Sequence, residues 1–427
     1  MAIGRGRELR LETAERRQIG FEMACIDDLL PVDHRARQVW DYVEGLDLSL
    51  LYGRVRTSSD TVGRPAIDPA ILMALWLYAT LEGVGSARLL DRLCTSDLAY
   101  RWLLGGVSVN YHTLADFRTE AGPFLDELLS RSMASLIAAG AVGVDVLAVD
   151  GLRVRASAGS GSFRSGGRLE ELHGAAAETV RKLRSEIEED PGSAGRRLKA
   201  RRLAAAEDRA RRLEEARRAH AEIERRRKEE AREQRRKQPR KTDKPPRAST
   251  SDPQARVMKM ADGGFRPAYN VQIKTTLEGS HIVGLAISNS GSDRGQLGPA
   301  VDEIERRYGR RPSRVVADGG YDGKDDIERL HTEKIEVFCP LPDTGRSDPT
   351  QPRRDDGPGV TAWRDRMASE PAQAIYKRRF ATERPHAHMR NHGLHRLLVR
   401  GIDKVKAVVL WHVHAFNFLQ FKRLKLA

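Results

Sequence analysis

The sequence predicts an α/β protein in which a mixed sheet with flanking helices is joined to an all-α region at the amino end and to an inserted, charged helical hairpin. Three observations support this prediction. Short β-branched apolar runs bounded by glycine turns recur in the second half of the chain, and helical patterns separate the later ones. Residues 1–140 show mainly helical apolar spacing. Between these parts lies a long polar stretch of Ala, Glu and Arg with helical character.

The helical region at the amino end, residues 1–140, is predicted to be a DNA-binding domain. Its clearest helix covers residues 70–81, with Asp68 as the cap and Pro69 at the first helical position. Several short helical patterns with glycine breaks follow between residues 86 and 118. They fit a helix-turn-helix-like DNA module and equally a helical packing domain, because this motif has no reliable sequence signature here.

The run 144–150 is predicted to be a buried strand that ends in Asp150. Gly151 then predicts a tight reversal into a second short strand, which carries Arg153 and Arg155. An ionised carboxylate at the end of a core strand is costly to desolvate unless a cation or hydrogen bonds compensate it. A metal ion could be that cation, although a turn-forming Asp explains a single such site at least as well.

Two further acids extend this pattern. The apolar run 314–317 leads into Asp318 and a glycine turn, which repeats the arrangement at Asp150. A third acid, Glu383, falls on one predicted helical face together with Tyr376, Arg379 and Arg390. Pro385 predicts a kink or a restart of that helix just after Glu383.

Residues 161–254 are predicted to be an inserted basic helical hairpin with a linker, its arms at 169–187 and 196–237. Residues 196–247 hold 22 Lys or Arg against 10 Asp or Glu, a net charge of +12. Such a concentration of charge is typical of a nucleic-acid binder, and the alternative is a solvated charged helix without a ligand. Residues 239–253 are predicted to be a disordered basic linker.

The remaining elements alternate between strands and helices. Strands are predicted at 269–274, 281–287, 314–317 and 336–339, helices at 295–308 and 324–332, and a loop at 341–371. With the Asp150 strand and the Glu383 helix, this is the element order of an RNase H-like fold, whose domain would comprise residues 141–160 and 255–427. An apolar helical face ends the chain and is assigned to packing.

Composition narrows the functional classes. A net charge of +14 and a pI near 9.9 indicate a polyanionic partner. Three widely spaced cysteines, Cys25, Cys94 and Cys339, suggest neither a disulfide framework nor a thiolate metal site, and they fit a reducing compartment. Since no secretion signal or membrane-spanning apolar stretch is found, we expect a cytoplasmic, nucleoid-associated protein without a membrane partner.

Taken together, these residues resemble bacterial insertion-sequence transposases of the DDE superfamily, in the group with a Tyr-two-Arg-three-Glu-six-Lys signature. Tyr376, Arg379 and Glu383 match that spacing. Arg390 stands where the family has Lys, which keeps the positive charge but not its point-charge geometry. Further stretches similar to the family are residues 64–118, 261–270 and 288–296.

The resemblance implies a metal-dependent endonuclease that also transfers strands at the ends of an insertion sequence. Its catalytic acids, which would hold two Mg²⁺ ions with Mn²⁺ as a substitute, are Asp150, Asp318 and Glu383. The expected DNA contacts are Tyr376, Arg379, Arg390, Arg153 and Arg155. The partners would be double-stranded DNA, as transposon ends and as target, and a second copy of the chain in a homodimer on that DNA.

Two other functions stay open. An RNase H-like DNA nuclease that cuts without joining ends would carry the same acids. A non-catalytic DNA-binding relic would use only the hairpin, and the presence of all three acids argues against it. A zinc site is disfavoured because the spacing of the nearby histidines matches no common site. These histidines, expected to line the DNA channel or the surface, are His386, His388, His392 and His395.

Overall fold

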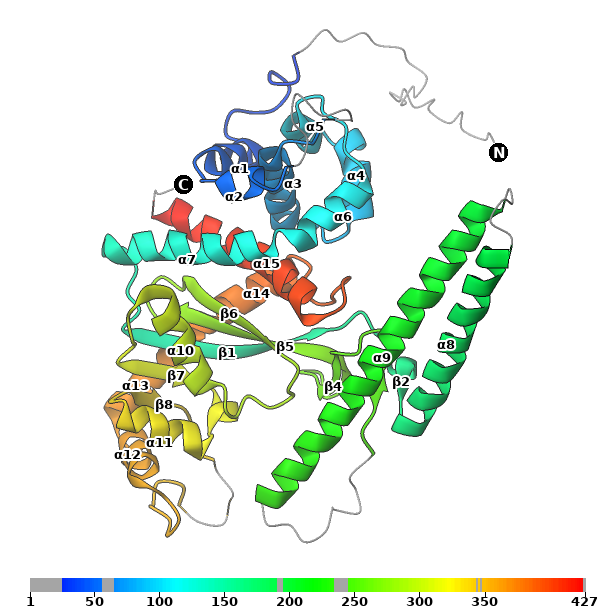
Figure 1. The fold of residues 1–427 in the computed structure, drawn as a ribbon. Helices are drawn as coiled ribbons and strands as arrows, with labels where there is room; N and C mark the ends of the chain where they lie inside the picture. The colour runs from blue at the N-terminus through cyan, green and yellow to red at the C-terminus, as the bar shows by residue number, and fades with distance from the viewer. Residues whose placement is uncertain are drawn as a thin grey trace, which may run out of the picture.

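The computed structural model describes residues 25–55, 65–189, 195–233, 245–342, 345 and 348–424. Its centre is a six-stranded mixed sheet in the order β4-β5-β1-β7-β8 (Figure 1). The sixth strand, β6, pairs with residues 270–275 of β5, beyond those that pair with β4. The strands are β1 (Val146–Arg155), β4 (Arg256–Lys259), β5 (Phe265–Thr276), β6 (Ile282–Ser288), β7 (Arg314–Ala317) and β8 (Glu336–Phe338). The pairs of β5 are antiparallel, whereas β1, β7 and β8 run parallel. This sheet confirms the predicted RNase H-like arrangement.

The strand of Asp150 does not turn at Gly151, so the predicted reversal there is wrong. β1 runs unbroken through both residues, which pair with β5 in one continuous antiparallel ladder. That long ladder keeps the dipeptide extended. Gly151 serves a close approach instead, because a Cβ at this position would lie only 2.7 Å from Oδ1 of Asp293.

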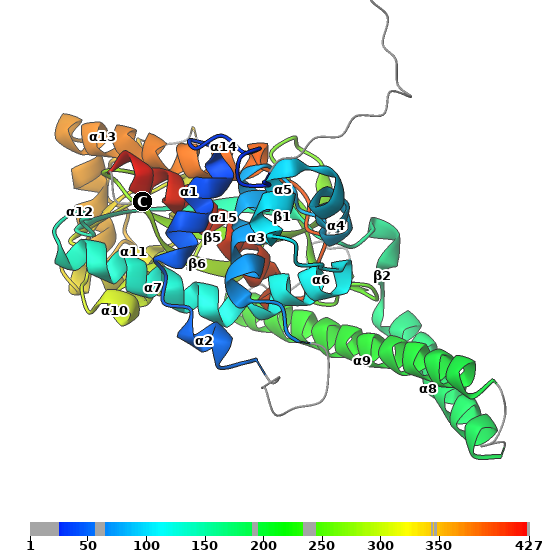
Figure 2. The same cartoon turned by 90° about the horizontal axis from the view of Figure 1, so that it is seen from above.

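Helices cover both faces of the sheet (Figures 1 and 2). One face carries α10 (Leu297–Tyr308) and α11 (Lys324–Thr332). α10 precedes β7, and the 3-10 turn η2 (Gly319–Tyr321) joins β7 to α11. The other face carries α13 (Glu370–Lys377), the 3-10 turn η3 (Arg378–Thr382) and α14 (Glu383–Asn391). The middle of β1 and the end of β7, which pair with each other, therefore lie between helices from both faces.

The stretch 341–371, predicted as a loop, contains a helix. This helix, α12 (Pro358–Met367), packs on α11 and β8. Three of its apolar side chains, Val360, Trp363 and Met367, are buried at three- and four-residue spacing. The surrounding Pro, Gly and Asp residues concealed this short pattern in the sequence.

The predicted amino-terminal helical region is confirmed for the part that the structure describes. Its helices are α1 (Arg35–Glu44), α2 (Ser49–Tyr52), α3 (Pro69–Leu81), α4 (Ala87–Ser96), α5 (Leu98–Leu104), α6 (Tyr111–Glu120) and α7 (Gly122–Ala138). Asp68 caps α3 as predicted, since its Oδ1 accepts a hydrogen bond from the Ala70 amide at 2.8 Å. Residues 1–24 and 56–64 lie outside the described residues.

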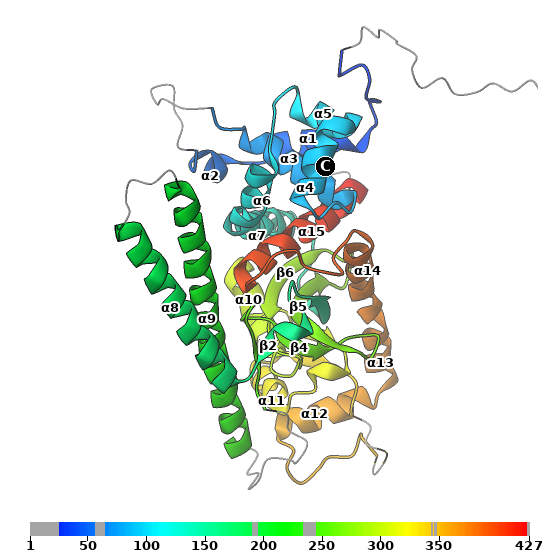
Figure 3. The same ribbon diagram turned by 90° about the vertical axis from the view of Figure 1, so that its right-hand side faces the viewer.

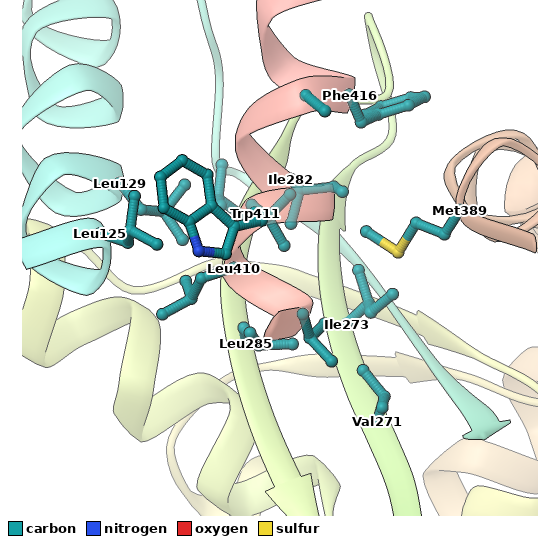
Figure 4. Close-up of a cluster of buried hydrophobic side chains, with 14 of the residues drawn as sticks. Leu125, Leu129, Val271, Ile273, Ile282, Leu285, Met389, Leu410, Trp411 and Phe416 are labelled. Atoms are coloured by element: carbon teal, nitrogen blue, oxygen red, sulfur yellow. The ribbon is translucent and has the colours of Figure 1, made fainter. Parts of the chain in front are cut away.

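The carboxyl-terminal helix α15 (Ile402–Arg423) joins the helical region to the sheet. It is apolar on nearly all sides and packs against α3, α6, α7 and β6. Trp411 lies toward Leu125 and Leu129 of α7, and Phe416 lies further along the same helix (Figure 4). One continuous hydrophobic core results, so the helical region and the sheet support each other.

The helical hairpin, formed by α8 (Gly166–Glu189) and α9 (Arg196–Glu233), projects away from the sheet (Figure 3). A 3-10 turn, η1 (Ser160–Ser162), and a two-stranded ribbon of β2 (Phe163–Arg164) and β3 (Ala248–Ser249) form its base. Its small core consists of Leu169, Ala176, Leu213, Ala216 and Ala248. Both predicted arms are confirmed, although residues 234–244, which include the end of the predicted second arm, lie outside the described residues.

The described part of the predicted disordered linker is ordered, which corrects that prediction. Besides β3, it contains Asp252, which is fully buried and accepts a hydrogen bond from the Tyr269 hydroxyl at 2.7 Å.

Two further findings concern the described residues as a whole. Cys25, Cys94 and Cys339 are all free thiols. No described helix combines the length and apolar character needed to cross a bilayer.

Candidate active site

Asp150 and Asp318 lie side by side on neighbouring parallel strands. Val149 of β1 pairs with Ala317 of β7, and each is followed directly by the aspartate. β7 ends there while β1 continues, so the sheet opens beside both carboxylates. Backbone amides orient them: Gly151 donates to Oδ1 of Asp150 at 2.8 Å, and Gly320 donates to Oδ1 of Asp318 at 2.9 Å.

This point carries an excess of negative charge. Burial raises the pKa of Asp318, the Gly320 amide opposes that rise, and the nearby charges of Asp150 and Asp293 raise it further. Burial likewise raises the pKa of Asp150, with the Arg379 guanidinium opposing the shift. Asp150 is only 8% exposed. We call the group formed by Asp150, Asp293 and Asp318 the acidic edge.

Arg379 lies between Asp150 and the third predicted acid. Its Nη1 is 3.2 Å from Oδ2 of Asp150, and its Nη2 is 3.7 Å from Oε1 of Glu383. The side chain of Glu383 is 67% exposed. The Thr382 hydroxyl also donates to Asp150, at 3.1 Å. The structure thus brings Glu383 near the acidic edge but engages it with an arginine rather than with the two aspartates.

The donor chemistry of this site fits a hard divalent cation. Asp150 and Asp318 supply carboxylate oxygens, the ligands that Mg²⁺ prefers. The two carboxylates repel each other, and a bound cation would neutralise their negative charge. Within the described ranges, however, no three His, Cys, Asp or Glu side chains converge closely enough to form a complete ligand set. A complete set would therefore require at least one side chain to move.

The helix of Glu383 breaks earlier than predicted. The chain passes from α13 through η3, and α14 begins at Glu383 itself, so the restart precedes this residue instead of following it. Pro385 then occupies the first turn of α14, where its missing amide leaves no hydrogen bond unmade. The break places Arg379 and Thr382 at Asp150 and leaves Glu383 exposed beside Arg379.

His386 was expected to line the DNA channel or the surface, but it is buried beside Asp150. Its Nδ1 is 3.6 Å from Oδ2 of Asp150, and burial, followed by the charges of Arg390 and Arg379, lowers its pKa to about 4. It is therefore neutral at physiological pH. The rings of His388 and His392 contact each other in a tilted arrangement with centroids 4.1 Å apart, and His395 is exposed. No zinc cluster of these histidines exists within the described part of the chain.

The predicted DNA-contacting residues occupy different environments. Arg379 lies over the Tyr376 ring at 6.0 Å, and Arg390 is exposed in the last turn of α14. Arg153 donates to two backbone carbonyls, those of Lys259 and Gly291, each at 3.0 Å. Arg155 is exposed at the end of β1. Their roles toward DNA stay predictions.

A buried polar network behind Gly151 was missed by the sequence analysis. Asp293 accepts hydrogen bonds from Asn270 at 2.6 Å and Gln272 at 2.7 Å, and Gln272 accepts one from the Tyr321 hydroxyl at 2.5 Å. Asn270 and Gln272 are two positions apart on β5, so both side chains point to the same face of the sheet. Asn270, Gln272 and Lys274 form a row of polar residues on one face of β5, and this row was the signal that could have revealed the network.

Comparison with known families agrees with the geometry. Residues 237–418 match the family model described as Transposase DDE domain, and residues 24–120 match Transposase domain (DUF772). The first match includes Asp318 and Glu383, while Asp150 lies before the inserted hairpin. Searches of curated proteins and of solved structures found no match. Transposase models thus match most of the helical region and the part of the sheet from β4 onward, and together with the RNase H-like strand order they support an insertion-sequence DDE transposase.

Proposed function

We propose that this transposase cleaves DNA at the ends of an insertion sequence and transfers the cut strands, in a reaction that depends on divalent metal. The observation that carries the proposal is the pair of carboxylates at the same level of adjacent parallel strands, with Asp150 buried and Asp318 half-buried. Their raised pKa values reflect a negative charge that lacks full compensation. Such a pair suits two Mg²⁺ ions, or Mn²⁺ in their place.

The residues of the chain would divide the work as follows. Asp150, Asp318 and Glu383 would hold the metal, and the amides of Gly151 and Gly320 fix the two aspartates. When bound, the ions would supply Lewis-acid stabilisation of charge on the phosphate and lower the pKa of the attacking water or 3′-hydroxyl. Glu383 joins the set by exchanging its contact with Arg379, whose planar guanidinium then suits a DNA phosphate.

DNA would be held at several places outside the acids. The helical hairpin contributes long-range attraction, because residues 196–247 carry a net charge of +12. Tyr376, Arg390, Arg153 and Arg155 are proposed to contact the DNA near the acidic edge, and residues 1–140 to form a DNA-binding domain. We also propose that two copies act together, one at each transposon end, in the cytoplasm on the nucleoid.

The experiment that tests this function is a cleavage and joining assay with purified protein. The substrate is DNA that carries the segments flanking the coding sequence on both sides, with a supercoiled plasmid as target. In Mg²⁺ we expect excision of the segment and its insertion into the plasmid. Cleavage without joined products would favour the nuclease alternative, and DNA binding without cleavage would favour the relic.

A further inference from the structure

Asp293 occupies an unusual position for a structural carboxylate. It precedes α10 on the opposite face of the sheet from α14, and it is 8% exposed. Both strong hydrogen bonds that it accepts, from Asn270 and Gln272, end on the same oxygen, Oδ1. Its other oxygen, Oδ2, has Arg153 at a long 3.4 Å. One oxygen is thus fixed by amides and the other is only weakly compensated.

The network around Asp293 is tied to the turn that carries Asp318. Tyr321, three residues after Asp318, is fully buried and donates to Gln272, which in turn donates to Asp293. Gly151 leaves the space that these groups need, since its missing Cβ would lie 2.7 to 2.9 Å from three of their polar atoms. Asp293 and Asp318 are therefore held in a fixed relation across the end of β7.

The two aspartates face a common space at Gly320. A Cβ placed on Gly320 would lie 3.1 Å from Oδ1 of Asp318 and 3.3 Å from Oδ2 of Asp293. A second observation indicates that the network around Asp293 lacks a hydrogen-bond donor or cation. Oδ1 of the fully buried Asn270 accepts no hydrogen bond from any described residue, and it lies beside Oδ1 of Asp293 at Gly151. Buried oxygens of this kind normally have a partner.

We propose that Asp293 is a further ligand of the divalent metal held by Asp318, reaching it from the face of the sheet opposite to Glu383. This inference rests on the proposed function. The amides of Asn270 and Gln272 act as the outer layer that orients the carboxylate, an arrangement found around metal-binding carboxylates generally. The competing explanation is that Asp293 only pins the segment 289–296 to β5.

The test measures Mn²⁺ binding to the full chain without DNA, by the decrease of the free-Mn²⁺ paramagnetic resonance signal. Asp293→Asn keeps the size of the side chain and is expected to weaken Mn²⁺ binding at least about tenfold. The matched control is Asp252→Asn, which alters another buried carboxylate that lies at Tyr269 and Gly401 and should bind Mn²⁺ like the wild type. Melting in EDTA shows whether both variants fold.

A second pair of variants serves if Asp293→Asn fails to fold. Gly320→Ala puts a methyl group between the two aspartates, whereas a Cβ at the neighbouring Gly319 meets no described atom within 4 Å. Only Gly320→Ala should weaken Mn²⁺ binding. Wild-type affinity in Asp293→Asn, or in Gly320→Ala, would overturn the proposal while leaving the proposed function intact if Asp318→Asn abolishes binding. A wild-type chain that binds no Mn²⁺ would overturn both.

Discussion

The acidic edge and the helical hairpin both concentrate charge, but they hold it in opposite ways. At the acidic edge a few carboxylates are desolvated, and burial raises the pKa of Asp150 and of Asp318. On the hairpin the charges are numerous and exposed, and many neutralise each other, as Arg225 does with Glu222 and Glu229. A desolvated charge that is only partly compensated favours a ligand at a defined point, whereas exposed charges create a diffuse field that salt screens. The first arrangement suits chemistry and the second suits holding a duplex.

Substitutions of the three predicted catalytic acids should have the largest effect on cleavage. Asp150→Asn, Asp318→Asn and Glu383→Gln should each lower the cleavage rate by roughly a thousandfold, because a metal ligand supplies several kcal/mol of transition-state stabilisation. DNA affinity, measured by gel shift, should stay nearly unchanged, since the hairpin is intact. Asp325→Asn, an exposed acid of α11, is the control. A variant of the three that cleaves normally would have to leave the proposed metal site.

A buried ion pair between β5 and α10 tests whether burial of charged groups alone makes a metal site. Lys274 contacts Glu303 at 2.6 Å, Arg307 contacts the same acid, and both partners of the first pair are almost fully buried. Lys274→Ala should lower the free energy of unfolding by about 1.5 to 3 kcal/mol, since Glu303 would lose one charged partner and keep Arg307. Denaturant titration measures this decrease. The remaining folded protein should bind Mn²⁺ normally, and weakened binding would contradict a purely structural role.

Removing the helical hairpin tests whether its exposed charges bind DNA. Replacing residues 168–247 with a short linker should leave a folded sheet but weaken DNA binding about tenfold or more at low salt. The slope of log affinity against log salt should also become shallower, by about 0.9 for each phosphate that the hairpin would otherwise neutralise. Fluorescence anisotropy over a salt series measures both quantities. An unchanged slope would mean that the hairpin is a solvated helix pair without a DNA role.

A smaller effect is expected at Arg390, which is exposed at the end of α14. Its position, about two turns beyond Glu383, suits a flanking phosphate and not the metal. Arg390→Ala should reduce end binding or strand transfer severalfold, while Arg390→Lys should keep most activity because the charge remains. Equal values for Arg390→Ala and the wild type in both assays would show that this signature position is incidental.

The smallest effect concerns stability and pH. The raised pKa of Asp318 means that the folded state binds this proton more tightly than the unfolded state, whose value is near 3.8. Without metal, the contribution of Asp318 to stability therefore disappears as pH rises above about 4. Asp318→Asn should melt slightly higher than the wild type at pH 7 in EDTA, and the difference should vanish below pH 4. A lower melting temperature at pH 7 would contradict the excess negative charge.

Features encoded in a local pattern could be predicted from the sequence. The apolar runs before Asp150 and Asp318 predicted two strands that deliver carboxylates, and the Asp68 cap predicted the start of α3. Gly151 was misread because Asp-Gly signals a turn and a close approach equally well. Only the pairing with β5, more than 100 residues away in the chain, decides between them.

The features that escaped prediction depend on contacts between distant segments. Asp293 joins the site through Asn270 and Gln272 on β5 and Tyr321 after β7, and no single stretch contains that pattern. The contact of Arg379 with Asp150 spans 229 residues and depends on the break in the helix before Glu383. Periodicity placed these residues on elements, but only tertiary packing placed them together.

The most direct test of the central claim is to locate the metal. Crystals of the protein soaked in Mn²⁺ should show an anomalous peak within about 2 to 2.5 Å of carboxylate oxygens of both Asp150 and Asp318. If Arg379 and Glu383 separate on binding, the Glu383 carboxylate should move toward the same peak. A peak elsewhere, or none at Mn²⁺ concentrations that support cleavage, would contradict the assignment of this edge of the sheet as the active site.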